Sequence, residues 1–204
     1  MSLSPIKHEI LEALLLEPKP IKAADLAKEI KKDFNPVMMH LLGLTRMGYA
    51  VSPEKGTYII TSRGKKVIGV AETSKEKAAA ILAYAPHDKS FNFYLNIDKP
   101  LGQHAHTIRD FANKMEKIDI ASLEFHMGRG DFEAWFRGLG DEETAKKLAI
   151  LKQRNLTGEH LREHLHEITE QRYLDLASLT GQPVAVEEHT HHHEHEPHTH
   201  THAH

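Results

Sequence analysis

The sequence predicts a mainly α-helical protein with one small β-hairpin, followed by a tail without regular structure. Apolar residues recur at helical spacing over most of the 204 residues, which indicates a series of amphipathic helices. Two β-prone segments, 49–51 and 57–61, flank the turn sequence SPEKG and predict the hairpin. Residues 179–204 lack apolar periodicity and are rich in histidine, so we expect a disordered tail there.

Three short helices are expected before the hairpin. The first spans residues 5–17 and ends at the prolines that follow it, and the second spans residues 22–31. The third starts with Asn35 as its N-cap and ends just before Gly48, a residue suited to the left-handed position after a helix. The element order is therefore three helices and a hairpin.

The segment GYAVSPEKGTYIITSRGKKVI resembles the wing of prokaryotic winged-helix regulators. In those proteins a glycine ends the recognition helix, a second glycine turns the wing, and a Thr-x-x-Gly-basic segment starts the next helix. The corresponding residues are Gly48, Gly56, Thr61, Gly64 and Lys65. The resemblance covers residues 5–68 and implies a winged helix-turn-helix, DNA-binding domain over residues 1–70.

The rest of the chain is predicted to hold a second, α-helical domain. Residues 62–83 are consistent with one continuous helix, and we interpret residues 71–87 as a linker helix between the domains. The second domain is expected over residues 88–178, and it opens with the β-prone FNFYLNI. Helical patterns then cover residues 102–117, 119–127, 131–139, 141–153 and 158–178. Asp131 and Asp141 are expected N-caps.

Within that domain, SLEFHMGRGDFEAWFRGLGDEETAKKL is similar to an uncharacterised domain family of prokaryotes, which has a Phe-His-x-x-Arg-Gly-Asp-Phe-x-x-Trp core followed by Leu-Gly-Asp. The matching residues are Phe125, His126, Arg129, Gly130, Asp131, Phe132, Trp135, Leu139, Gly140 and Asp141. The resemblance implies no established activity. We expect His126 to be buried and hydrogen-bonded, and Phe132 and Trp135 to be core residues. Arg129 and Asp131 are expected to form a capping ion pair.

The third predicted helix carries the side chains that would read DNA. Its exposed positions are poor in the Arg, Lys, Asn and Gln residues that read base edges. Its methionines favour contact with thymine methyl groups or readout of DNA shape, or alternatively an adaptable protein-binding face. Basic side chains of the hairpin and the next helix would contact phosphates. The expected DNA-binding residues are Asn35, Met38, Met39, Arg46, Lys55, Arg63, Lys65 and Lys66.

The tail predicts transition-metal binding, because imidazole is a good ligand for Ni²⁺, Cu²⁺, Zn²⁺ and Co²⁺. A purification tag is usually an uninterrupted run of histidines, whereas this tail is broken by Thr, Glu, Pro and Ala, so we interpret it as native. It resembles the histidine-rich stretches of nickel-handling accessory proteins, which favours nickel, with zinc next. The expected ligands are His189, His191, His192, His193, His195, His198, His200, His202 and His204.

A fixed metal site in the second domain is a further hypothesis. His104 and His106 lie two residues apart near a predicted helix start, so a loop there could chelate through both rings. His160 and His164 share one helical face at the spacing that metal-binding helices use. Solvated surface histidines are the alternative interpretation of this spacing.

Composition and motifs narrow the functional classes. Residues 1–70 hold eleven Lys and Arg against seven Asp and Glu, whereas the rest holds fifteen against twenty-two, as in a nucleic-acid-binding head on an acidic body. The chain has no cysteine, which excludes disulfides and thiolate metal sites. An apolar signal core and long apolar runs are missing, so we expect a cytoplasmic protein without a membrane partner. The sequence contains no nucleophile elbow, phosphate loop, dinucleotide fingerprint or HExxH helix, so we do not expect an enzyme.

The favoured hypothesis is a dimeric transcriptional regulator that binds double-stranded DNA and responds to a divalent transition metal. The alternative is a metal chaperone or storage protein whose winged helix contacts a protein partner. A third hypothesis is a regulator whose second domain binds a small effector while the tail buffers metal. The third helix, with its methionines, separates the first two hypotheses.

Overall fold

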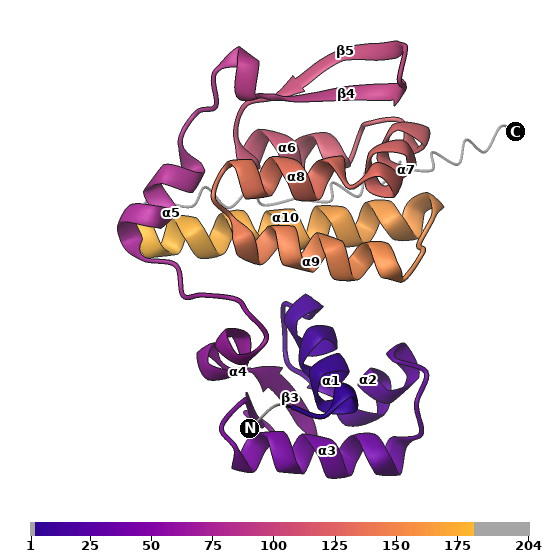
Figure 1. The fold of residues 1–204 in the computed structure, drawn as a ribbon, viewed down its shortest axis with the longest axis vertical. Helices are drawn as coiled ribbons and strands as arrows, with labels where there is room; N and C mark the ends of the chain where they lie inside the picture. Colours follow the sequence, from indigo (N-terminus) through magenta and orange to yellow (C-terminus); the bar gives the residue numbers. More distant parts are fainter. Residues whose placement is uncertain (1–2, 182–204) are drawn as a thin grey trace, which may run out of the picture.

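The computed structural model describes residues 3–181. Within them the chain is mainly helical with two small antiparallel sheets, which confirms the predicted mainly α class. Figure 1 shows two groups of elements: α1–α4 with the first sheet below, and α5–α10 with the second sheet above. We call them the N-terminal group and the C-terminal group. None of the helices in the described range is long and apolar enough to span a membrane.

The helices are α1 (Pro5–Leu16), α2 (Ala23–Glu29), α3 (Phe34–Arg46), α4 (Ser62–Val67), α5 (Lys75–Leu82), α6 (Ile108–Met115), α7 (Ile120–Arg129), α8 (Asp131–Gly138), α9 (Glu142–Gln153) and α10 (Gly158–Thr180), with a short 3₁₀ helix η1 (His87–Lys89). The strands are β1 (Ile21–Lys22), β2 (Ala50–Val51), β3 (Thr57–Ile60), β4 (Phe91–Asn96) and β5 (Lys99–Ala105).

The N-terminal group packs three helices against a three-stranded sheet of order β1-β3-β2. The predicted hairpin is present as β2 and β3, in which Ala50 pairs with Ile60. Strand β1 was not predicted, because two residues show no periodicity and their pairing with β3 is long-range: Ile21 pairs with Tyr58. Gly56 takes a φ of 82° in the hairpin loop, a left-handed conformation that glycine adopts without strain.

The third helix differs from the prediction at its start and agrees at its end. It begins at Phe34, and Asp33 rather than Asn35 is the N-cap residue. Gly48 follows the helix with a φ of 73°, as predicted for the residue that ends it. On the inner face of the helix, Leu41 and Leu44 are fully buried in an apolar cluster with residues of α1 and α2. Burying a leucine side chain contributes about 1.5–3 kcal/mol, so this face holds the helix in place.

The connection between the groups is interrupted, so the prediction of one helix over residues 62–83 is wrong. Helix α4 ends at Val67 and α5 begins at Lys75. Gly69 has a φ of 85°, which stops α4 because a right-handed helix cannot continue through it. Helix α5 is also more than a linker, since its Ala78 and Ile81 are buried in the C-terminal core and it packs along α10.

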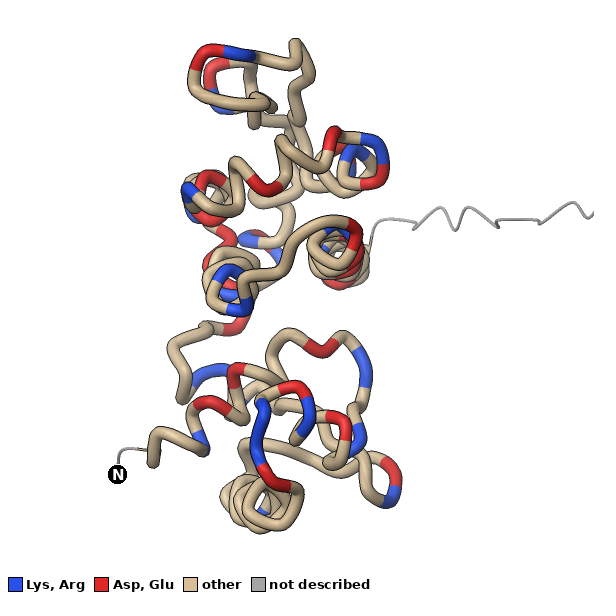
Figure 2. Tube along the Cα trace, turned by 90° about the vertical axis from the view of Figure 1, so that its right-hand side faces the viewer, with Lys and Arg blue, Asp and Glu red and all other residues tan. Residues whose placement is uncertain are grey.

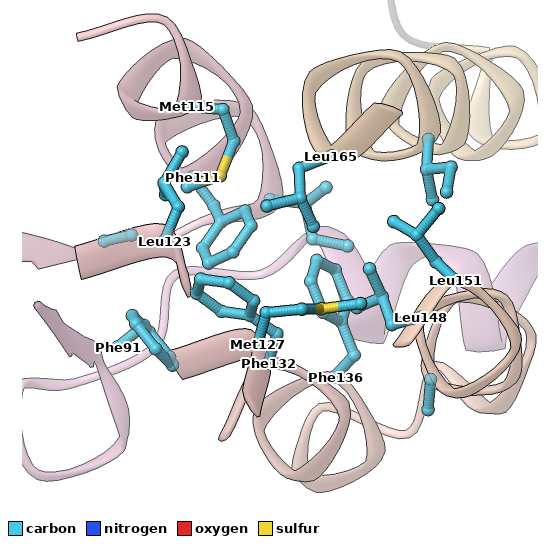
Figure 3. Packing of buried hydrophobic residues seen from close by; sticks show 14 of the residues in the cluster. Phe91, Phe111, Met115, Leu123, Met127, Phe132, Phe136, Leu148, Leu151 and Leu165 are labelled. Atoms are coloured by element: carbon cyan, nitrogen blue, oxygen red, sulfur yellow. The ribbon is translucent and has the colours of Figure 1, made fainter. Parts of the chain in front are cut away.

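The C-terminal group surrounds an aromatic core, which Figure 3 shows from close by. The rings of Phe111 and Phe132 meet edge to face with centroids 5.3 Å apart, a geometry worth about 0.5–1.5 kcal/mol beyond the buried area. The predicted helix over residues 102–117 is wrong in its first part, because residues 99–105 form β5 and pair with β4. Pro100 and Gly102 lie in that strand, and both disfavour a helix.

The N-cap residue of α9 is the predicted one, whereas that of α8 differs from the prediction. The Asp141 side chain accepts a hydrogen bond from the Thr144 N–H at 3.3 Å and so caps α9, as predicted. Asp131 is instead the first residue of α8, whose N-cap is Gly130 with a φ of 79°. The carboxylate of Asp131 is therefore free to bind other side chains.

The two groups contact each other along α1 and α9. Leu16 of α1 is buried in the C-terminal core, and Ile150 of α9 packs against both cores. Lys146 of α9 forms an ion pair with Glu12 of α1, with Nζ 3.2 Å from the carboxylate. Apolar and charged contacts therefore both join the groups.

Candidate functional site

Helix α3 presents a line of exposed side chains on the outside of the N-terminal group. We call this line the α3 ridge; it consists of Asn35, Met39, Leu42 and Arg46. Figure 2, in which α3 lies at the bottom and is seen along its axis, shows that the helix is almost free of charged residues. Met39 is 67% exposed and Leu42 is 37% exposed. The ridge therefore offers apolar contact, one amide and one guanidinium.

Met38 does not belong to this ridge, contrary to the prediction. Its side chain is half-buried against the N-terminal core, and its Sδ accepts a hydrogen bond from the Tyr58 hydroxyl at 3.6 Å. Consecutive residues of a helix point about 100° apart, so Met38 is turned toward the core while Met39 faces solvent. Met39 is the exposed one.

Three of the predicted phosphate-binding cations lie exposed near the hairpin. Lys55 lies in the loop between β2 and β3, and Lys66 lies on α4. Arg63, also on α4, lies over the Tyr49 ring with its guanidinium carbon 5.3 Å from the ring centroid. A cation–π contact of this kind positions the guanidinium while leaving its donors available.

Lys65 is engaged elsewhere. Its Nζ lies 2.6 Å from a carboxylate oxygen of Glu143 on α9, across the junction of the two groups. The structure thus gives Lys65 a role in joining the groups in place of the predicted phosphate contact.

The Thr-x-x-Gly segment explains how α4 is held beside α3. The Thr61 hydroxyl accepts from the Gly64 N–H at 3.0 Å and donates to the Gly48 carbonyl at 2.7 Å. A Cβ on Gly64 would lie 2.1 Å from the Tyr49 carbonyl oxygen, so this close approach requires glycine. These contacts fix the basic start of α4 against the end of α3.

A buried network of charges connects α4, α9 and α10. The Arg172 guanidinium donates to both carboxylate oxygens of Asp141 at 2.8–3.1 Å and to Glu143 at 3.1 Å. Burial alone would raise the pKa of Glu143, but the charges of Lys147, Arg172 and Lys65 outweigh it and lower that pKa. Burial would likewise lower the pKa of Arg172, and the two carboxylates reverse this. Both shifts favour the charged forms of Glu143 and Arg172, so this ion pair joins α9 to α10.

A cavity of about 350 Å³ opens between β4, α7 and α8, and the Phe-His-x-x-Arg-Gly-Asp segment lines it. Tyr94, Phe125 and Trp135 provide aromatic walls. The Arg129 guanidinium carbon lies 5.2 Å from the Phe125 ring centroid, and its Nε donates to Asp131 at 3.1 Å. Small-molecule sites have volumes of about 300–1,000 Å³, so the cavity has the size and lining for a small planar ligand.

His126 is buried and hydrogen-bonded, as predicted. Its Nε2 accepts from the Tyr94 N–H at 2.8 Å, so the ring proton is on Nδ1, which donates to Asp131 at 2.8 Å. Burial lowers the pKa of His126 although Asp131 acts to raise it, which favours the neutral ring. Because both nitrogens are engaged within the protein, His126 is a structural residue. The predicted Arg129–Asp131 pair is present, but it anchors His126 and does not cap α8.

The histidines predicted to form a folded metal site fall at opposite ends of α6. They are His104, His106, His160 and His164. The first two precede the start of α6, whereas Arg162, between the last two, donates to the carbonyl of Met115 at the end of α6. The four residues therefore do not form one site.

His160 and His164 lie on the solvent side of α10. The Nδ1 of His164 is hydrogen-bonded to the His160 carbonyl at 2.8 Å, and the His160 side chain is 84% exposed. Within residues 3–181, no group of three or more His, Cys, Asp or Glu side chains already stands in metal-holding geometry. The nine tail histidines, and the predicted disorder of the tail, lie outside the described residues.

The structure adds one histidine that sequence reasoning missed. His87 of η1 lies beside His104 and His106, with ring centroids 5.1 Å and 6.2 Å away. No spacing rule connects His87 to a pair seventeen and nineteen residues further along the chain. Only the return of the β4–β5 hairpin brings the three rings together.

The described residues form a mainly helical C-terminal group and a smaller N-terminal group that packs against it. Residues 63–170 match a Family of unknown function (DUF5752), and the chain belongs to that family. The matched range runs from α4 into α10 and includes the cavity and the His126–Asp131 pair, whereas α1–α3 and the first sheet precede it. No curated protein and no solved structure matches the chain.

Proposed function

We propose that the chain is a transcriptional regulator that binds double-stranded DNA through its N-terminal group and responds to a divalent transition metal. The observation that carries the proposal is the position of α3, which lies on the outside of the three helices and leads directly into the β2–β3 hairpin (Figure 1). A winged-helix domain places its recognition helix and wing in this order.

The placement of charge supports the same docking mode. Lys55 in the hairpin loop, together with Arg63 and Lys66 on α4, would contact phosphates beside a groove that holds α3. On the ridge, Asn35 and Arg46 have the side-chain types that read adenine and guanine edges. Met39 and Leu42 offer the apolar contacts that a thymine methyl group accepts.

Replacing two of the hairpin-side cations tests this docking. Lys55→Ala with Lys66→Ala should weaken binding to all duplexes alike, because phosphate contacts carry no sequence information. Each lost phosphate contact should also flatten the log–log salt dependence of affinity by about 0.9. The measurement is fluorescence anisotropy with a duplex selected from a random pool, over a range of salt concentrations.

The matched control replaces two exposed lysines of the C-terminal group, Lys75→Ala with Lys99→Ala. This control removes the same net charge at a distance from the β2–β3 hairpin. It should therefore leave the salt dependence of DNA affinity unchanged. Equal losses in both double variants would reject the docking mode.

A regulator of this kind is expected to act as a homodimer. The selected duplex should then contain two half-sites about one helical turn apart, as two-fold symmetric winged-helix proteins require. Light scattering with and without the duplex checks the stoichiometry. Metal should change the DNA affinity by about 5- to 150-fold, the usual range of allosteric coupling.

A second function, that of a metal chaperone or store that docks on a protein, is favoured by the apolar surface of α3. Phe34 is 48% exposed and lies at the start of the same helix as Met39 and Leu42. Arg46→Ala separates the two functions: for DNA readout it should relax selectivity at one base pair, by about 1–3 kcal/mol. If selection enriches no duplex above background, the protein-docking function is the better account.

A further inference from the structure

Three imidazoles converge at the open end of the β4–β5 hairpin. His104 lies in β5, His106 follows that strand, and His87 lies in η1 on the segment that packs against it. The ring centroids of His104 and His106 are 6.5 Å apart, and those of His87 and His104 are 5.1 Å apart. Ala105 between the first two is fully buried, so both neighbouring side chains point away from the core.

Hydrogen bonds to oxygen set the proton position on two of the rings. The Nδ1 of His106 lies 2.9 Å from the Ala85 carbonyl, which can only accept, so Nδ1 carries the proton. The Nδ1 of His104 bonds to the side-chain oxygen of Asn92. The amide of Asn92 is oriented by its own nitrogen, which donates to the Ser90 carbonyl at 3.2 Å.

These bonds leave the second nitrogen of each ring with a lone pair. In the described part of the chain, neither Nε2 makes a hydrogen bond to the protein. Metal-ligating histidines almost always donate the other ring N–H to a carbonyl, carboxylate or amide oxygen, which fixes the tautomer and the ring orientation. His104 and His106 are therefore prepared in the way that metal ligands are.

The third ring is held near the other two by backbone and stacking contacts. The Ala85 N–H donates to the His106 carbonyl at 2.7 Å, and the Tyr84 ring stacks on His106 with centroids 4.7 Å apart. His87 follows two residues later and is exposed, so its side chain can rotate toward the pair. The fold thus restricts how far the third imidazole can move away.

The spacing decides how much the rings would have to move. Nitrogen ligands lie about 2.0–2.1 Å from Zn²⁺, which places the centroids of two imidazoles on one ion roughly 5–5.5 Å apart. The 5.1 Å pair already meets this spacing, and the pairs at 6.2 Å and 6.5 Å exceed it by about 1 Å. A side-chain rotation of His87 with a small shift of His106 would bring the nitrogens onto one ion.

We propose that His87, His104 and His106 form a binding site for a divalent transition metal of the Zn²⁺ or Ni²⁺ type. Three neutral imidazoles suit these ions and leave a fourth position for water. The site would supply the metal response of the proposed function, and its regulatory role rests on that proposal. It replaces the predicted four-histidine set with a cluster at one end of the hairpin, to which His160 and His164 do not belong.

Direct metal binding tests the site without any DNA. The protein is the full-length chain in which each of the nine tail histidines is replaced by asparagine, so that tail binding does not mask the site. Calorimetric titration with Zn²⁺ should show one ion bound per chain. His87→Ala, His104→Ala and His106→Ala should each weaken it by at least about tenfold, since even second-shell losses cost about 10- to 100-fold.

The matched control is His160→Ala with His164→Ala, which removes two imidazoles from the solvent side of α10 and should leave Zn²⁺ affinity unchanged. Nitrogen-15 spectra of the histidine rings give a second readout, in which Zn²⁺ should shift the Nε2 signals of His104 and His106. Binding that survives in the His87/His104/His106 triple variant, or that disappears in the control, would overturn the proposal. If the protein binds Zn²⁺ at this site but binds no duplex, the proposed regulatory function is rejected and the metal site stands. The two failures can therefore be distinguished.

Discussion

The buried polar residues of the described chain all lie in the C-terminal group, whereas the N-terminal core is built from apolar side chains and Tyr58. Arg172, Asp141 and Glu143 are 3%, 0% and 6% exposed, and they satisfy one another across two helices. The N-terminal group has no charged side chain among the buried residues of the described range, and one close backbone approach, at Gly64, fixes its geometry. Buried polar contacts thus contribute to the C-terminal core, whereas the N-terminal core rests on apolar packing.

The largest expected loss of stability follows from removing Arg172 from the buried charge network. Arg172→Leu leaves the buried carboxylate of Asp141 without its cation, although Glu143 keeps Lys65 and Lys147, and leaving a buried charge unpaired costs about 3–5 kcal/mol of unfolding free energy. Urea denaturation measures the change.

An exposed ion pair of the same group provides the matched control. Arg137 lies 3.7 Å from Glu142, and both side chains are more than half exposed, at 55% and 56%. Arg137→Leu should cost no more than about 1 kcal/mol, because solvent screens such pairs. A similar small loss in Arg172→Leu would show that the buried network contributes little to stability.

A smaller effect is expected in the N-terminal group at Gly64. Gly64→Ala would place a Cβ against the Tyr49 carbonyl oxygen, a backbone atom that cannot move aside, and such overpacking costs about 1–3 kcal/mol. Gly128 in α7 has open space around it, so Gly128→Ala should instead stabilise by about 0.5–1 kcal/mol. Thermal unfolding of both variants checks the opposite signs.

The same comparison explains what the sequence could predict. The three N-terminal helices, the hairpin and the Gly48 and Thr61 positions follow local patterns of periodicity, caps and turns, so they could be predicted. Strands β1 and β5 could not be predicted, because long-range pairing overrides weak or contrary local preference.

The candidate sites show the same limit. The helical and hairpin patterns correctly predicted that Met39, Lys55 and Lys66 are exposed. They also predicted an exposed Met38, which is half-buried against the core. Lys65 was assigned to phosphate because its partner Glu143 lies seventy-eight residues further along the chain. His87 was missed for a similar reason, since its neighbours come from another element. For Lys65 and His87, the contacts depend on residues far along the chain, and residue type alone does not predict them.

A pH-dependent effect is expected at the junction of the groups, where Glu17 follows α1. Burial raises the pKa of Glu17 to about 7, with further contributions from the charge and hydrogen bond of Glu29 and from Glu167, while Arg154 opposes the shift. Between the ordinary value of 4.5 and about 7, the folded state therefore holds a proton that the unfolded state has released.

Stability should consequently fall as pH rises through that interval, since the folded state binds more protons than the unfolded state there. Glu17→Gln stays neutral and keeps a hydrogen-bonding group beside Glu29, so its unfolding midpoint should decline less between pH 4.5 and pH 7 than that of the unmodified chain. Glu54→Gln, on the hairpin loop away from the junction, should keep the original decline. Parallel slopes for all three proteins would mean that Glu17 is solvated, and that the groups pack less tightly at this point than at Lys65 and Glu143.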